Sequence, residues 1–436
     1  MSIVLTTVSR VQIVTLIATT FSCYRTAPDA PDAIRPPQKR RLKEYEGTPP
    51  ELWFHIFTFL GDAGLDLASL TMVSKSFAAL AQPLLFRHIT IRPPCGQHPT
   101  SGRSKRGADY LERVTDRMRF VTQDRIAHAV TTIEFSPIIK YGSGKTEVAV
   151  VADMVIRTLP LFPRLRSFRC AHLILQPRHI HTIYGMTHLR SFHVTNCHLS
   201  HYYYSRDNPH ESLIEDFTMG WQGDTSDLLG VTLSPHSHQR WFSFMHPDHL
   251  RTLQLSPLDA FLDRMLADLI GRDIKFHALR SLGLPWMAVL SESFVPLLER
   301  APFLQELRLT VRPSHRTITM CHRLPRHVLQ NLLVLEAPDH ALPFLLQNKS
   351  LRELTCTSVR DGGSLPTDVI AAFDALPLGA LQELETLSLG MECLSDELLD
   401  CVAKKARGIT TLDVDIRGMA WGPKPGSLRS HTPEVQ

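Results

Sequence analysis

The sequence predicts an α/β protein in which a short unit of three helices precedes a long array of alternating strands and helices. Three observations indicate this class. An apolar helix pattern with two early prolines lies near residue 50, and a six-residue apolar phrase recurs from residue 130 onwards. The 436 residues are 43% hydrophobic and 21% charged, a composition that excludes disordered, collagenous and polytopic membrane proteins.

Charge and cysteine usage narrow the function classes further. The 47 basic and 43 acidic residues give a net charge of +4 without a long basic stripe, so we expect no nucleic-acid partner. The eight cysteines are spread thinly and form no Cys-x-x-Cys pair. We therefore predict reduced thiols in a cytoplasmic or nuclear protein, rather than a disulfide scaffold or a zinc ribbon.

Residues 1–47 are predicted to be a disordered tail and linker. The apolar run 11–18 weakly resembles a secretory signal, but it is too short and too often interrupted to span a membrane. We favour an undocked tail over a signal or anchor, and expect no membrane partner. Residues 26–47 are rich in proline and hold the basic cluster Lys39, Arg40, Arg41 and Lys43. A solvated linker is the favoured interpretation, with nuclear import as the alternative.

The first folded unit is predicted at residues 48–92 and opens with a helix over 48–60. Thr48 suits the N-cap, the two prolines suit the first turn, and Glu51 stands at capping-box spacing. Gly61 or Gly64 is expected to end the helix. Its apolar residues cover most of the circumference, in two adjacent stripes made of Leu52, Ile56, Phe59 and Leu60, and of Trp53 and Phe57.

Two further short helices are expected, at 66–72 and at 74–81 before Pro83. A unit of this size buries only a low fraction of its surface, and each large apolar side chain left in water forgoes about 1.5–3 kcal/mol. The missing cover must come from the rest of the chain or from another protein.

Residues 48–91 resemble an F-box of the kind seen in fungal proteins. Thr48 stands where a leucine is usual, and Phe77 stands where a tryptophan is common. The matching elements are Pro49-Pro50-Glu51-Leu52, Ile56-Phe57, Leu60, Leu67, Leu70, Val73-Ser74-Lys75 and the closing segment 83–91.

The resemblance implies docking onto the Skp-type adaptor of a cullin–RING (SCF) ubiquitin ligase. The positions that it assigns to adaptor binding are Pro49, Pro50, Leu52, Ile56, Phe57, Leu60, Leu67, Leu70, Val73 and Phe77.

After a predicted linker at 93–110, one phrase recurs at intervals of 19 to 36 residues: an apolar residue, two variable ones, an apolar one, one variable and another apolar. Its ending alternates as in a half-buried strand, and a regular return of this length is typical of a solenoid. Helices are expected between the strands, for example at 258–270 and 394–406. The phrase begins at Val130, Leu165, Leu189, Leu250, Leu279, Leu304, Leu351, Leu384 and Ile409, with weaker copies at Ile214 and Leu332.

Residues 111–418 resemble an irregular leucine-rich-repeat array, followed by a disordered tail at 419–436. The resemblance implies parallel strands on a concave face, with helices and loops on the convex face. The asparagine usual after each strand is mostly missing, since only Asn196 stands near such a position.

In this geometry the variable residue between the last two apolar residues of each phrase faces the concave surface. The series runs from basic and histidine-bearing to acidic, so it could recognise a target segment of opposite polarity. The alternative is a set of solvated strand residues. In chain order the series is Arg169, His193, Thr218, Gln254, Gly283, Arg308, Glu336, Thr355, Ser388 and Asp413. The substrate-binding candidates among them are Arg169, His193, Gln254, Arg308, Glu336, Ser388 and Asp413.

Three other signals are weaker. Residues 142–146 imitate the end of a phosphate-binding loop, but Ile139 stands where that pattern needs glycine. The histidine pairs 179/181, 236/238 and 246/249 lie in expected loops without a cysteine at useful spacing, so no metal site is predicted. Two aromatic insertions, 196–210 and 220–249, are either contact sites or folded back onto the array.

The two resemblances together imply a non-catalytic substrate receptor in the ubiquitin conjugation pathway. The F-box would bind the adaptor, the repeats an unidentified protein target, and a separate enzyme would transfer ubiquitin by proximity. We expect no catalytic residue, cofactor or metal. The alternatives are a non-ligase interaction scaffold using the same repeat surface, and a secreted or membrane-tethered repeat protein using residues 1–23.

Overall fold

The computed structural model describes most of the chain between residues 49 and 416. Contacts divide the chain into two compact units at His55 and Ile56, inside the first described helix. Within the described residues, no helix combines the length and apolar character needed to cross a membrane. The expected tails, 1–47 and 419–436, lie outside the described residues, which are 49–62, 67–93, 104–137, 145–200, 213–221, 241–242, 244–256, 259–271, 274–311, 324–325, 327–346, 351–358, 363–377 and 379–416.

Helix α2 (Pro50–Asp62) confirms the helix expected at 48–60 and ends two residues later. Its last turn approaches helix α3 (Leu67–Thr71) closely. A Cβ added at Gly61 would lie 3.0 Å from Cδ1 of Leu67, so a larger residue there would require the Leu67 side chain to shift.

Helix α4 (Lys75–Leu85) begins at a capped N-terminus, because the Ser74 hydroxyl accepts a hydrogen bond from the Phe77 N–H at 3.1 Å. The expectation that this helix stops before Pro83 is wrong. Proline so close to the C-terminal end removes only one backbone hydrogen bond. The helix therefore continues, and the Phe86 N–H donates to the Gln82 carbonyl at 3.1 Å.

Among the described residues, twelve parallel strands form one sheet, and their order in the sheet is the chain order. Each of the eleven predicted phrases gives a strand that begins two residues after the first apolar residue of the phrase. The strands are β1 (His88–Ile91), β2 (Thr132–Phe135), β3 (Ser167–Ala171), β5 (Ser191–Thr195), β7 (Asp216–Gly220), β8 (Thr252–Ser256), β9 (Ser281–Pro285), β10 (Glu306–Thr310), β11 (Val334–Pro338), β12 (Glu353–Thr357), β13 (Thr386–Met391) and β14 (Thr411–Ile416). Two short strands, β4 (Ile174–Leu175) and β6 (His198–Leu199), form a separate pair.

Strand β1 was assigned to the end of the helical unit by sequence, yet it pairs with β2 as the first strand of the sheet. The sequence holds the signal for it, since Phe86, Ile89 and Ile91 repeat the spacing of the phrase.

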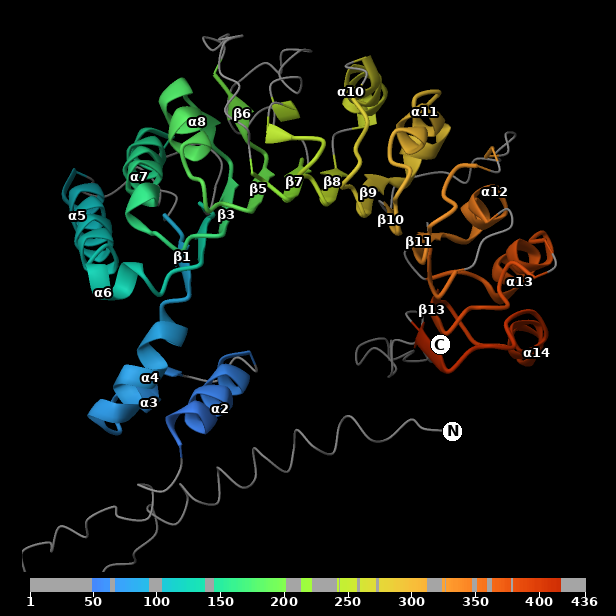
Figure 1. Ribbon diagram of the computed structural model, residues 1–436, viewed down its shortest axis with the longest axis horizontal. Coiled ribbons are helices and arrows are strands. Elements are labelled where there is room, and N and C mark those ends of the chain that lie inside the picture. The colour runs from blue at the N-terminus through green and yellow to red at the C-terminus, as the bar shows by residue number, and fades with distance from the viewer. Residues whose placement is uncertain are drawn as a thin grey trace, which may run out of the picture. The chain divides into compact units, whose positions relative to one another are not determined.

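Helices connect most of the strands and lie along one side of them (Figure 1). The helix α5 begins inside the expected linker 93–110, and the helices expected at 258–270 and 394–406 are confirmed as α10 and α14. The connecting helices are α5 (Ser104–Val121), α6 (Asp124–Ala127), α7 (Lys145–Thr158), η2 (Leu159–Leu161), α8 (Pro177–Tyr184), α10 (Asp259–Gly271), η4 (Trp286–Leu290), α11 (Phe294–Glu299), η5 (Asp339–Ala341), α12 (Leu342–Leu345), α13 (Pro366–Asp374) and α14 (Asp396–Lys405).

The core lies between the strands and these helices. The second and fourth residues of a strand point to the helices, as Leu282 and Leu284 do in β9, and both are fully buried. The alternate residues lie on the other side, which we call the open face. This division follows from the two-residue period of strand side chains.

Between β7 and β8, the described residues 241, 242 and 244 form a 3-10 turn that carries large aromatic side chains. Trp241 and Phe244 are buried, and their rings lie 6.2 and 5.1 Å from that of Phe192 on β5. Trp221 and Phe242 are buried as well. Of the two possibilities left open for the insertion 220–249, its described aromatic residues fold back into the core. The remainder, 222–240, lies outside the described residues.

Candidate functional site

Helix α2 carries large apolar side chains that the chain leaves in solvent. Leu52 is 53% exposed and Phe54 is 41% exposed. Pro49 is exposed too, and its carbonyl accepts the Leu52 N–H at 3.0 Å to open the helix. The side chain of Pro50 is outside the described residues. Leu52 is thus exposed, and its role in adaptor binding stays a prediction.

The candidates between Ile56 and Phe77 divide into buried and exposed positions. Phe57, Leu60 and Leu67 are buried, and the rings of Phe57 and Phe77 meet edge to face with centroids 5.2 Å apart. These buried side chains pack the helices against one another. Three further candidates have side chains of intermediate burial: Ile56, Leu70 and Phe77.

The turn after α3 is the most exposed apolar point of this segment. Met72 is 86% exposed and Val73 is 49% exposed. Their backbone is fixed, because the Met72 and Val73 N–H groups donate to the carbonyls of Ser69 and Leu70, each at 3.2 Å. Val73 belongs to the predicted adaptor-binding positions, whereas Met72 does not. A large apolar side chain next to a helix end was the feature of the sequence that could have indicated Met72.

The second candidate surface is the open face of the sheet. The middle residues of β3 to β14 are Cα partners strand by strand, so all ten predicted positions form one continuous row in register. The structure therefore brings the candidates together. Their role in binding a target stays a prediction.

Members of this row differ in accessibility. Arg169, Gln254, Arg308 and Asp413 are exposed. Gly283 is buried beneath its neighbour, since a Cβ added there would lie 3.1 Å from Cγ of Gln254. The remaining members, His193, Thr218, Glu336, Thr355 and Ser388, are half-buried.

Several members of the row already bond to adjacent side chains. The Ser191 hydroxyl lies 2.6 Å from Nε2 of His193, and Arg308 forms an ion pair with Glu306. Burial lowers the pKa of His193, and the charge of Arg169 lowers it further against the opposing effect of Asp216. His193 is therefore a neutral hydrogen-bonding group at neutral pH.

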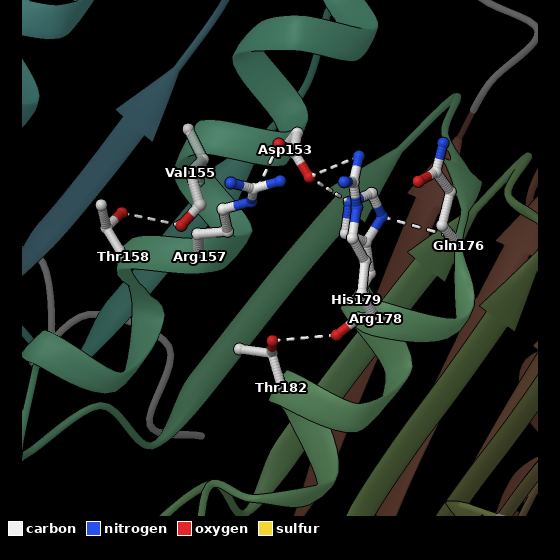
Figure 2. A network of polar contacts seen from close by, with 8 residues as sticks. All are labelled: Asp153, Val155, Arg157, Thr158, Gln176, Arg178, His179 and Thr182. Atoms are coloured by element: carbon white, nitrogen blue, oxygen red, sulfur yellow. Dashed lines mark hydrogen bonds and ion pairs between the residues drawn. The ribbon is translucent and has the colours of Figure 1, made fainter.

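A polar network on the helix side of the sheet has the residue types of a catalytic site (Figure 2). The Asp153 carboxylate on α7 lies 2.9 Å from Nε2 of the buried His179 on α8, 2.9 Å from Nε of Arg157 and 3.0 Å from Nη2 of Arg178. Burial alone would raise the pKa of Asp153, but the hydrogen bond with His179 and the two arginines lower it.

Both ring nitrogens of His179 are engaged, since Nδ1 accepts the Gln176 N–H at 3.2 Å. The neighbouring hydroxyls of Thr158 and Thr182 donate to helix carbonyls. The network thus fastens α8 to α7 and presents no nucleophile to its histidine. It also corrects the expectation that His179 and His181 lie in a loop, because both are on α8.

The remaining sequence signals give no further site. Among the residues that the structure describes, no group of three or more His, Cys, Asp or Glu side chains could hold a metal ion. The rings of His246 and His249 pack at a tilt with centroids 4.8 Å apart, whereas His236, His238 and residues 138–144 lie outside the described residues. Cys170 and Cys197 are buried thiols with sulfur atoms 3.9 Å apart.

Comparison with known proteins bears on the helical segment. A family model described as F-box-like matches residues 49–92, which span α2 to α4 and strand β1. No curated protein matches the chain. Residues 49–92 therefore carry an F-box-like domain, and the parallel sheet that follows is compatible with a leucine-rich-repeat array.

Proposed function

We propose that this chain is a non-catalytic substrate-recognition subunit of an SCF-type ubiquitin ligase. Its F-box-like domain binds a Skp-type adaptor, and through it a cullin–RING ligase. The repeats, as a leucine-rich-repeat solenoid, bind a target protein through the open face. Such a role belongs to the cytoplasm or the nucleus.

The observation that carries this proposal is the exposure of Leu52 and Phe54, and of Met72 and Val73, within the segment that matches the F-box-like family. Large apolar side chains scattered singly on a surface are ordinary. Here they gather in a short segment whose family resemblance implies a docking partner, and a partner that covers them would gain about 1.5–3 kcal/mol for each fully buried side chain.

Co-purification with a Skp-type adaptor tests the proposal. The wild-type chain should retain the adaptor, and the Leu52→Asp and Met72→Asp variants should lose it, because each places a charge on a surface that must become dry. Leu161→Asp is a matched control, since Leu161 on η2 is 55% exposed. Its adaptor binding should be that of the wild type.

Recovery of a cullin with the wild-type chain distinguishes a ligase subunit from an interaction scaffold. The ligase proposal expects cullin to be recovered in proportion to adaptor, and to disappear with it in Leu52→Asp. Adaptor without cullin would favour the scaffold. Failure of the wild type to retain an adaptor would contradict the proposed function as a whole.

A further inference from the structure

Arginines gather at the beginnings of strands β3 to β9, one residue before each strand. Arg166, Arg190, Arg251 and Arg280 hold this position, and Glu215 holds it before β7. Backbone hydrogen bonds continue the sheet through these residues: the Arg190 N–H donates to the Arg166 carbonyl, and the Arg280 N–H to the Arg251 carbonyl, each at 2.8 Å. The four arginines, here called the arginine row, therefore lie on rungs of one ladder.

The geometry sets the size of a ligand. Adjacent strands are about 4.8 Å apart, so the four strand spacings from Arg166 to Arg280 cover about 19 Å, the length of about six residues of extended chain. Row and ligand would run across the strands at their N-terminal ends.

Three guanidinium groups have donors to offer. Arg166 and Arg169, the latter at the middle of β3, are exposed and bond to no side chain in the described part of the chain. The Arg251 side chain is 67% exposed, and its ion pair with Glu215 is 3.4 Å long.

The other two arginines are held in place. Nη1 of Arg190 donates to the Thr187 carbonyl at 3.1 Å, and Nη1 of Arg280 donates to the Phe303 carbonyl at 3.2 Å. Their charges are thereby fixed along the row, because each guanidinium is anchored to a turn before a strand.

Positive charge exceeds negative charge here, and the sign reverses farther along the sheet. Glu215 and Asp216 accompany the five arginines at these strand beginnings and middles, and Glu134 on β2 is the Cα partner of Arg169. Around β12 to β14, Arg352 holds the position before β12, but the acidic residues Glu353, Glu385 and Asp413 at the beginnings and middles of these strands outnumber it. A long polyanion such as nucleic acid would run into this acidic end, whereas a short acidic segment would not.

The spacing also distinguishes carboxylates from phosphates. A phosphoryl group carries nearly two charges at one point and is favoured where several guanidinium groups converge. These arginines are instead distributed singly along a line. The half-buried residues Thr252 and Ser281 at first strand positions add hydroxyl donors for carboxylate oxygens.

We propose that the arginine row and Arg169 bind an extended, unphosphorylated segment of about six residues rich in Asp and Glu. This inference rests on the proposed function and names the class of target that the repeats take.

Fluorescence anisotropy with the full chain tests it, using a labelled peptide of four Glu-Ser repeats. A second peptide has glutamine for each glutamate, and a third adds two phosphoserines to the glutamine peptide to restore a similar total charge. The glutamate peptide should bind at least about tenfold more tightly than the glutamine peptide, and more tightly than the phosphorylated one. Tighter binding of the phosphopeptide, or equal binding of all three, would overturn the proposal.

Matched variants locate the site. Arg166→Gln/Arg169→Gln/Arg251→Gln should weaken the glutamate peptide about tenfold. Arg117→Gln/Arg125→Gln/Arg407→Gln removes three exposed charges elsewhere and should change its Kd less than about twofold. Equal losses in both variants would contradict a defined site.

A gain of binding provides a readout that misfolding cannot imitate. Glu215 competes for Arg190 and Arg251, at 3.3 and 3.4 Å, so Glu215→Gln should tighten peptide binding about twofold to fivefold. Unchanged or weaker binding would count against the row. Adaptor co-purification with the same variants keeps the two proposals separate, because it should remain at the wild-type level whatever the peptides do.

Discussion

The F-box-like domain and the sheet treat their apolar residues in opposite ways. Leu52 on α2 is 53% exposed, whereas Leu282 on β9 is fully buried beneath the helices. Short helices α2 to α4 have little chain to cover them, while each strand shares its core with the strands and helices on both sides. The exposed apolar side chains of the first region can therefore pack against a partner. The buried apolar side chains of the second region stabilise the fold of the chain.

Truncating one leucine in each region tests this contrast and has the largest expected effect. Leu282→Ala should lower the free energy of unfolding by about 2–5 kcal/mol, because it removes buried methyl groups and leaves a cavity. Leu52→Ala should change it by less than about 0.5 kcal/mol. Denaturant titration of both variants measures the difference, and comparable losses would remove the distinction between the regions.

Acidification should destabilise the fold through a buried histidine on β6. Burial lowers the pKa of His198 to about 4, and its ring packs at a tilt against that of Trp221, with the centroids 4.8 Å apart. The unfolded chain takes up this proton near pH 6.5, so the neutral form stabilises the fold above that pH. The stabilisation should be lost progressively as pH falls from 6.5 to 4, by up to about 3 kcal/mol.

Unfolding titrations at pH 7 and pH 4.5, with His198→Phe as the comparison, check this expectation. The variant keeps an aromatic ring against Trp221 but takes up no proton, so its stability should depend less on pH. The same slope in wild type and variant would assign the acid sensitivity to other groups.

One helix cap in each region allows a second comparison, with a smaller expected effect. Ser74 caps α4 through the Phe77 N–H at 3.1 Å, and Ser395 caps α14 through the Leu398 N–H at 3.3 Å. Each change to alanine should cost about 1 kcal/mol of helix stability. Ser74→Ala should also weaken adaptor binding, and Ser395→Ala should leave it unchanged. Calorimetric titration with the adaptor measures the affinity of both variants. Equal losses of affinity in Ser74→Ala and Ser395→Ala would contradict adaptor binding through the F-box-like domain.

Much of the fold could be predicted from the recurring phrase, because the two-residue period and buried leucines fix which side chains face the helices. For this reason the phrase alone places Arg169 and Asp413 in one row across the strands. The extension of α4 through Pro83 and the early start of α5 escaped prediction, because local propensity there gives way to packing and to the small cost of proline near a helix end.

The candidate site was predicted less completely. Leu52 and Val73 are exposed, but Phe57, Leu60 and Leu67 are buried, and a family pattern does not separate residues that touch a partner from those that support them. Arginine recurs as the second residue of the phrase, at Arg166 and Arg190 among others. What the sequence could not show is that Glu215 lies between two of these arginines and engages both.

Hydrogen–deuterium exchange of the full chain, with and without a Skp-type adaptor, tests the central claim most directly. If the adaptor binds through the F-box-like domain, its binding should slow exchange at the backbone amides of α2 and of the turn at Met72 and Val73. Exchange in strands β2 to β14 should be unchanged. Protection confined to the sheet, or none in the F-box-like domain at saturating adaptor, would contradict the central claim.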